Sequence, residues 1–246
     1  MLIFSLDCRS EFTAESLVGA LADLGVSPST FEWELSEIEV GDHHLHFDRE
    51  EVQGVQAVRF GVHGGILHVD HPHSPQDHDH TDRENDIPYV QVRRRIEAAR
   101  CSAFVRSHSL GIFHRIASAK GELSEIPVEQ IQFREAEALE WLVTAVLSCI
   151  GLDQLGLAQI FFRQTDRGEP IGHPSPDHAL SRAILSQLSA SGPISASPVG
   201  AAILAEFAAK FDSPPKLKST RIGHGLGPNT DRGQPSLLQA TLGEAE

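Results

Sequence analysis

Imidazole and carboxylate side chains are concentrated in one short stretch, DHPHSPQDHDHTD, which covers residues 70–82. It contains four histidines, four aspartates and no large apolar side chain. Neutral imidazole is a preferred ligand of nickel, zinc and copper, and carboxylates neutralise the charge of the ion. The composition favours a loop that binds metal loosely and exchanges it, while a solvated loop without a biological metal is the alternative. The expected ligands are His71, His73, His78, Asp79 and His80.

A second group of histidines precedes this loop, within the strand-like segment HHLHFD at residues 43–48. Side chains on a strand alternate between its two faces, so His44 and His46 share one face and supply two further candidate metal ligands. The alternative is an edge strand that turns polar side chains outward.

The net charge lies entirely in the first third of the chain. Lys and Arg total 20 against 34 Asp and Glu, which gives −14. Residues 1–86 hold 18 acids and 4 bases, whereas residues 87–246 hold 16 of each. Such a chain lacks the excess of cations that nonspecific nucleic-acid binding or an anionic membrane surface requires. We expect neither as a partner, and we expect the acidic region to attract cations.

Cysteine usage and hydropathy predict a cytoplasmic protein. The three cysteines, Cys8, Cys101 and Cys149, include no CxxC pair and cannot form a disulfide framework. The start of the chain lacks the basic region of a secretory signal. Residues 141–152 form the longest apolar stretch, which is too short to cross a bilayer and is typical of a buried helix.

The elements that must position these residues alternate between strand and helix patterns. Residues 2–6 read as a strand, and residues 12–25 as a helix that Thr13 caps and Gly25 ends. Three strand-like segments follow at 43–48, 55–62 and 65–70, as an antiparallel meander or hairpin.

Helical patterns dominate the second part of the chain from residue 88 to residue 156. A strand is expected at 159–165, helices at 178–188 and 199–211, and strands at 219–227 and 236–243. The fold class is therefore α/β or α+β, with a mixed sheet, packed helices and a disordered acidic His-rich loop. The expected regions are 1–69, the loop 70–86, and 87–246, which forms one compact domain with 1–69.

Three further places carry candidate functional residues. Asp7 ends the first strand, where α/β domains often place functional groups, although a helix-capping acid is an equal alternative. Ser197 and Gly200 lie at a helix start that either binds a phosphate or is simply capped. Gly223 and Gly225 in GHGLG either let the backbone approach a ligand or form a turn between strands.

Several of these segments occur in an order that is characteristic of one family. The order is LDC, LVGALADLGV, the His-rich loop, IFHRIASAKG, IPVEQIQFREAEAL, SPVGAAIL and GHGLG with SLLQATLG. Along nearly its whole length the chain thus resembles the LarC-type nickel-insertion family, which acts in biosynthesis of the nickel-pincer nucleotide cofactor, pyridinium-3,5-bisthiocarboxylic acid mononucleotide.

The resemblance implies a nickel cyclometallase of the lyase class. Such an enzyme places nickel into the metal-free pincer nucleotide, with sulfur and carbon bonds to the metal. It hydrolyses CTP with a divalent cation such as Mg²⁺ or Mn²⁺. The resemblance assigns catalytic roles to Asp7 and Glu135, and cofactor contacts to Ser197, Gly200, Gly223 and Gly225.

The departures from the family pattern open a second hypothesis. The family's glycine turn after LDC is absent, and Gln132 and Arg134 replace both histidines of the HFHE motif. Val199 replaces a threonine, and the longer members carry a further C-terminal region that we associate with CTP. The alternative to an active enzyme is a catalytically degenerate relative that binds or delivers metal, or a subunit that needs a separate C-terminal partner chain.

Overall fold

The computed structural model describes most of the chain outside the His-rich segment. The described residues are 2–38, 40, 43–63, 86–157, 159–165, 176–186, 188, 194–207, 209–211, 214–229 and 235–246. The expected strand at 65–70 lies outside them, as do the expected metal ligands between residues 71 and 80.

A mixed six-stranded sheet forms the centre of the fold, which confirms the expected mixed α/β class. Its order is β2-β3-β7-β8-β1-β6, with β1–β6 and β3–β7 parallel and the other neighbours antiparallel. The sheet therefore combines strands from both ends of the chain. Its strands are β1 (Leu2–Cys8), β2 (His44–Val52), β3 (Val55–His63), β6 (Gln159–Gln164), β7 (Leu217–Asn229) and β8 (Pro235–Ala245).

The β2–β3 pair is an antiparallel hairpin, as its alternating sequence predicts. Gln53 and Gly54 join the two strands with φ angles of 54° and 78°. Positive φ at both central residues is characteristic of a type I′ turn, whose twist matches the twist of the flanking strands.

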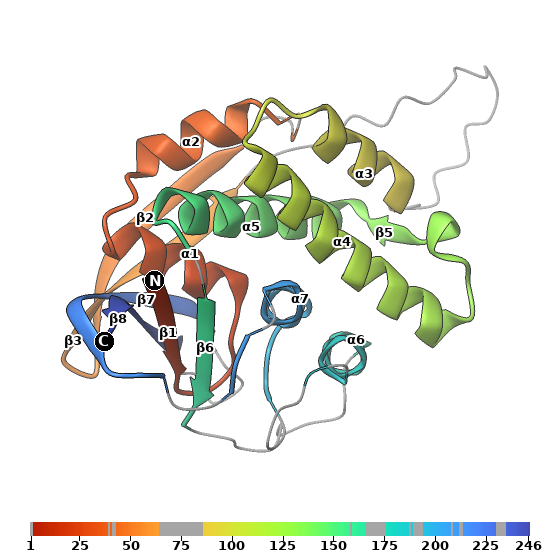
Figure 1. Ribbon diagram of the computed structural model, residues 1–246. Helices are drawn as coiled ribbons and strands as arrows, with labels where there is room; N and C mark the ends of the chain where they lie inside the picture. Colours follow the sequence, from red (N-terminus) through yellow and green to blue (C-terminus); the bar gives the residue numbers. More distant parts are fainter. Residues whose placement is uncertain are drawn as a thin grey trace.

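Seven α-helices are described, and Figure 1 shows them gathered beside the sheet. The first begins where predicted, because Thr13 and Ser16 form a reciprocal capping box. Gly25, with φ 110°, follows its end. The helices are α1 (Ala14–Asp23), α2 (Pro28–Ser36), α3 (Tyr89–Ala98), α4 (Ala103–Ser124), α5 (Glu135–Gln154), α6 (Pro176–Leu185) and α7 (Pro198–Glu206).

Helix α7 is shorter than the helix expected at 199–211. Lys210 accepts a hydrogen bond from the backbone N–H of Phe162 (2.7 Å) and donates one to the carbonyl of Ile160 (2.9 Å). The chain is therefore extended at this point and pairs in parallel with the edge strand β6. Satisfying the free backbone groups of that edge outweighs the helical pattern of the sequence.

Glycines allow α1 to lie directly on the sheet. A Cβ atom at Gly225 would lie 1.8 Å from the carbonyl oxygen of Ser16, and one at Gly223 would lie 2.5 Å from that of Ala20. Gly19 on the helix is equally close to β3, because its Cβ would lie 2.3 Å from the carbonyl oxygen of Val58. The GHGLG segment thus belongs to the strand expected at 219–227, which is confirmed, and the alternative of a turn between strands is wrong.

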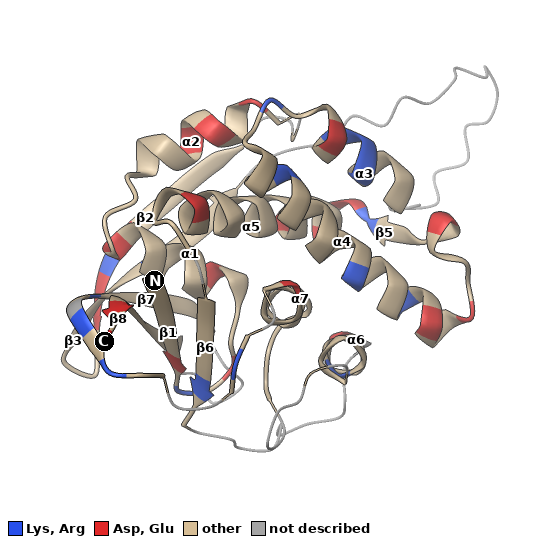
Figure 2. Cartoon of the chain, in the orientation of Figure 1, with Lys and Arg blue, Asp and Glu red and all other residues tan. Residues whose placement is uncertain are grey.

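The remaining helices build outward from α1. Helix α5 packs on α1, and α4 packs on both α5 and α7. A small second sheet of β4 (Asp86–Pro88) and β5 (Gln132–Arg134) lies next to the start of α5. Figure 2 shows Lys and Arg residues on α3 and α4, and further ones on β5 and β6.

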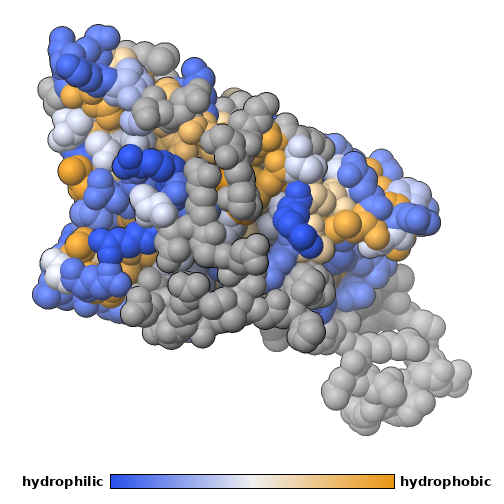
Figure 3. Space-filling model, turned by 90° about the horizontal axis from the view of Figure 1, so that it is seen from below, coloured by the Kyte–Doolittle hydropathy of each residue, from blue (hydrophilic) through white to orange (hydrophobic). Residues whose placement is uncertain are grey.

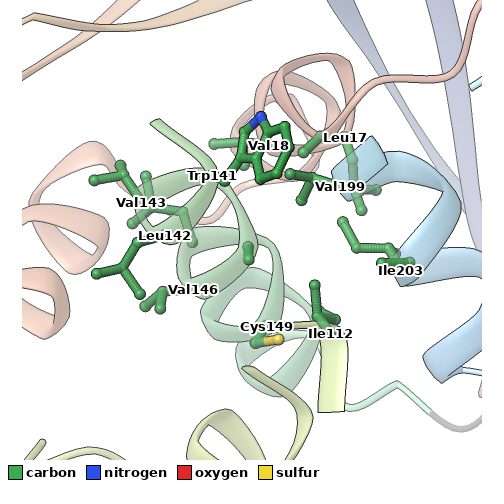
Figure 4. Close-up of a cluster of buried hydrophobic side chains, with 14 of the residues drawn as sticks. Leu17, Val18, Ile112, Trp141, Leu142, Val143, Val146, Cys149, Val199 and Ile203 are labelled. Atoms are coloured by element: carbon green, nitrogen blue, oxygen red, sulfur yellow. The ribbon is translucent and has the colours of Figure 1, made fainter. Parts of the chain in front are cut away.

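The core lies where α1, α5 and α7 meet. Figure 4 shows Trp141 on α5 close to Leu17 and Val18 on α1 and to Val199 on α7. Leu17 and Val18 are fully buried, and Trp141 is 9% exposed. The nearly continuous apolar run of α5 is explained by this position, since other helices surround it.

No helix in the described parts of the chain is long and apolar enough to span a lipid bilayer. Figure 3 shows hydrophilic residues interspersed with hydrophobic ones on the face seen from below.

Candidate functional site

A cavity of about 620 Å³ opens where four helices begin. Its walls come from the first turns of α1, α6 and α7, from the first two turns of α5, and from the residues just before α1, α5 and α7. Pro228 on β7 completes the lining. The positive end of a helix macrodipole favours negative charge in the first turn. The position therefore suits acidic side chains or an anionic ligand.

Backbone hydrogen bonds hold two of these helix starts together. The N–H of Phe12 donates to the carbonyl of Ser195, and the N–H of Ser197 donates to the carbonyl of Phe12, both at 2.9 Å. Gly200 makes this approach possible, because a Cβ there would lie 2.5 Å from the carbonyl oxygen of Phe12. The starts of α1 and α7 are thus one rigid wall of the cavity.

Carboxylates dominate the cavity lining. Six of the lining residues are acidic and one, Arg134, is basic. The acidic residues are Glu11, Glu15, Glu135, Glu137, Glu140 and Asp177. Carboxylates that line a concave site create a negative potential that concentrates cations.

Glu135 is the first residue of α5 and the site residue that the family resemblance singles out. Its Oε1 atom is buried and accepts no hydrogen bond from the protein. A buried carboxylate oxygen without a partner is costly, so the atom is placed for a cation or a donor from a ligand.

Two other carboxylates on α5 differ in their surroundings. Glu137 has two cationic neighbours, Arg134 at 3.8 Å and Lys120 at 4.0 Å. Loss of hydration raises the pKa of Glu140, and the nearby carboxylates of Glu15, Glu137 and Asp177 raise it further. The carboxyl group of Glu140 therefore holds its proton more readily than a carboxyl group in water does.

We expect Glu140→Gln to stabilise the fold at neutral pH. The pKa of Glu140 is raised in the folded state, so its ionisation above that pKa opposes folding. Because Glu140 is exposed to screening solvent, the gain should be about 0.5 kcal/mol or less. It should vanish below about pH 4, where both states hold the proton. Urea unfolding at pH 7 and pH 4 measures it, with Glu122→Gln, an exposed acid on α4, as the control. Equal effects of both variants would refute the explanation.

Asp7 lies away from this cavity. Leu6 and Cys8 point into the helix-covered core, so the alternating side chain of Asp7 points to the opposite face of the sheet. There Asp7 forms an ion pair with Arg163 on the neighbouring strand. The structure does not bring Asp7 and Glu135 together at this cavity.

The four candidate cofactor contacts fall into two groups. Ser197 lines the cavity and also caps α7, because its hydroxyl accepts a hydrogen bond from the N–H of Gly200 (3.2 Å). Gly223 and Gly225 face α1, whose backbone occupies the space beside them. Their need for glycine is therefore explained by packing of the helix on the strand.

Histidines from the β2–β3 hairpin lie together at one end of the two strands. The ring centroids of His44 and His46 are 4.5 Å apart, and those of His46 and His63 are 4.7 Å apart. Within the residues that the structure describes, no three His, Cys, Asp or Glu side chains are placed to hold a metal ion. The histidines of the loop lie outside those residues, so metal binding there remains a proposal.

Two of the free cysteines are poor metal ligands at neutral pH. Burial raises the pKa of Cys8 to about 11 and that of Cys149 to about 12. The thiolate is the form that binds metal, and both groups remain thiols near pH 7.

Five of the six acids in the cavity were not predicted from the sequence. The run EAEALE contained a usable signal, since Glu137 and Glu140 are three residues apart and share one side of a helix. Glu15 follows a recognisable cap at Thr13. No local signal in the sequence indicates that Glu11, Glu15 and Asp177 lie close to the acids of α5, because these residues come from different segments of the chain.

Fold and site together define a mixed α/β domain with a carboxylate-lined cavity at the starts of four helices. The chain belongs to the nickel insertion protein family, whose profile matches residues 4–246. No solved structure matches the chain.

Similar proteins carry names that refer to nickel. The chain is 27% identical over 249 residues to the "Pyridinium-3,5-bisthiocarboxylic acid mononucleotide nickel insertion protein" of Desulfitobacterium hafniense, covering 97% of this chain and 58% of the relative. A protein of that name in Geobacillus kaustophilus is 28% identical, with 99% and 60% covered. A "Putative nickel insertion protein" of Citrifermentans bemidjiense is 28% identical, with 100% and 62% covered. The chain thus spans about three-fifths of the length of these relatives.

Proposed function

We propose that this chain acts in biosynthesis of the nickel-pincer nucleotide cofactor, where it brings Ni²⁺ together with the metal-free pincer nucleotide. The acidic cavity carries this proposal, because it combines a cation-attracting lining with the buried, unpartnered oxygen of Glu135. The family match over residues 4–246 and the names of the relatives support nickel as the metal.

Nickel is the substrate of this reaction, and several groups of the chain have proposed roles. The histidines of the loop collect the ion, with His44 and His46 as additional ligands close to one another. The carboxylates of the cavity attract the ion, and Glu135 contacts the complex of metal and nucleotide. The presence of three free cysteines supports a location of the protein in a reducing compartment such as the cytoplasm.

CTP does not suit the cavity lining that the structure describes. The three phosphate groups of CTP need several cationic partners, whereas the lining offers six carboxylates and a single guanidinium, which suits one phosphate group. We therefore propose that CTP, with Mg²⁺ or Mn²⁺, binds outside this cavity, in a region equivalent to the part of the longer relatives that this chain does not cover.

The alternative function is metal delivery without catalysis. It is favoured by Gln132 and Arg134, which stand where the family motif has histidines, and Arg134 lines the cavity. A delivery protein needs to bind nickel and release it, and it needs no fixed site for the nucleotide.

Conversion of the metal-free pincer nucleotide distinguishes these functions. The purified chain is mixed with Ni²⁺, the nucleotide and CTP with Mg²⁺, with or without the C-terminal region of a relative, and the nickel-bound product is detected by mass. We expect nickel binding by the chain alone, and product only when the C-terminal region of the relative is present. Product from the chain alone would refute the proposal that CTP binds outside this part of the family's length. Nickel binding without product in every arm would favour delivery.

Replacing the four loop histidines with alanine serves as the matched arm of this experiment. If the loop collects nickel, this variant should need more nickel for the same rate and should reach the same rate at saturation. An unchanged nickel requirement would refute the role of the loop.

A further inference from the structure

Arg134 occupies a distinctive place in the cavity. It is the one cationic side chain among the described lining residues, and it lies immediately before the first turn of α5. The α5 helix is 20 residues long, so its positive end adds to the charge of the guanidinium. An anionic group that enters the cavity is therefore attracted to this point.

The guanidinium of Arg134 is accessible for a ligand. Its side chain is 64% exposed. The Nη2 atom is 3.8 Å from the nearest oxygen of Glu137, which is too far for a hydrogen bond. Glu137 also has Lys120 as a neighbour, so it retains a cationic partner if Arg134 turns to a ligand.

The chemistry of the nucleotide supplies a matching group. The relatives' name describes a mononucleotide, which carries one phosphate, with two thiocarboxylic acid groups on a pyridinium ring. The planar fork of an arginine binds phosphate oxygens through two parallel hydrogen bonds. A single guanidinium suits one phosphate group, and the six carboxylates leave few other places for a dianion.

We propose that Arg134 is the phosphate-binding residue of this cavity and that it makes the site selective for a mononucleotide. The proposal rests on the proposed function and adds the contact that orients the organic substrate. With the phosphate at Arg134, the ring and its sulfur groups extend into the carboxylate-lined part of the cavity, where the cation is attracted.

Calorimetry with the metal-free pincer nucleotide tests this assignment on the full chain. We expect Arg134→Gln to weaken binding by about 10- to 100-fold, because a charge-assisted contact is lost. The affinity of Arg134→Lys for the nucleotide should lie between the affinities of the unmodified chain and of Arg134→Gln, since lysine keeps the charge and lacks the planar fork of arginine. Arg163→Gln is the matched control, because Arg163 is also 64% exposed and paired with a carboxylate, on the opposite face of the sheet. Equal weakening by Arg134→Gln and Arg163→Gln would overturn the proposal.

The nucleoside that lacks the phosphate distinguishes a contact with the phosphate from a contact with a thiocarboxylate. If Arg134 binds the phosphate, Arg134→Gln should leave nucleoside binding within about twofold of the unmodified chain, well below the loss for the nucleotide. An equal loss for nucleoside and nucleotide would assign Arg134 to a thiocarboxylate and overturn the phosphate assignment. If the unmodified chain binds the nucleotide and Arg134→Gln binds it equally well, only this inference fails. No nucleotide binding by the unmodified chain would overturn the inference and the proposed function together.

Discussion

Replacing Gly225 with alanine is expected to cost at least about 3 kcal/mol of the free energy of unfolding, because the packing of α1 on the sheet has no room for a methyl group. The new Cβ would lie 1.8 Å from the carbonyl oxygen of Ser16 and 2.5 Å from the backbone nitrogen of Ala20. Both neighbours are backbone atoms of α1, so relief requires the whole helix to move. Urea unfolding of the purified variant measures the loss.

Gly61→Ala is the matched control for this prediction. Gly61 lies on β3 of the same sheet, and a Cβ there meets no atom within 4 Å. We expect its effect to remain within about 0.5 kcal/mol. Similar losses for both variants would show that alanine is poorly tolerated in these strands for a reason other than contact with α1.

Glu135→Gln is expected to have the largest effect on function, a loss of about 100-fold or more in nickel insertion. The substitution keeps the size of the side chain and removes the negative charge from the buried oxygen that no protein group satisfies. A group that holds charge or moves a proton at the reacting centre commonly contributes a factor of that order. The measurement is the rate of product formation with the C-terminal region of the relative present, together with nickel retained by the chain in the presence of nucleotide.

Two comparisons make the Glu135 experiment decisive. Glu122→Gln removes an equal charge from an exposed position on α4 and should leave both measurements unchanged. Asp7→Asn tests the other acid that the family resemblance selects, whose carboxylate is paired with Arg163 on the opposite face of the sheet. Since the structure separates the two acids, we expect a much smaller loss for Asp7→Asn. A larger loss for Asp7→Asn than for Glu135→Gln would place the reaction outside this cavity.

The family resemblance selected Glu135 as a site residue, and the structure adds that this residue begins α5 and lines the cavity. The antiparallel pairing of the segments at 43–48 and 55–62 was correctly predicted, as were the cap at Thr13 and the end of α1 near Gly25. These features depend on side-chain alternation, on capping hydroxyl groups and on glycine conformation, all of which operate within a few residues.

The role of GHGLG was decided by the tertiary structure. In the sequence, the glycines of GHGLG are compatible with a ligand contact or with a turn between strands, and both explain the pattern equally well. The space beside Gly223 and Gly225 is filled by the backbone of α1, which is about 200 residues earlier in the chain.

The sequence by itself determined the family, the mixed α/β class and the types of residue available for nickel chemistry, because motif order and local patterns are properties of the linear chain. Only the tertiary structure decided which acids share a site. It separated Asp7 from Glu135 by placing them on different sides of the sheet. It also gathered Glu15, Glu140 and Asp177 from three helices into one cavity. The physical reason is that burial of apolar helix faces against the sheet dictates where helices begin in space, and the acids in their first two turns are carried to that place.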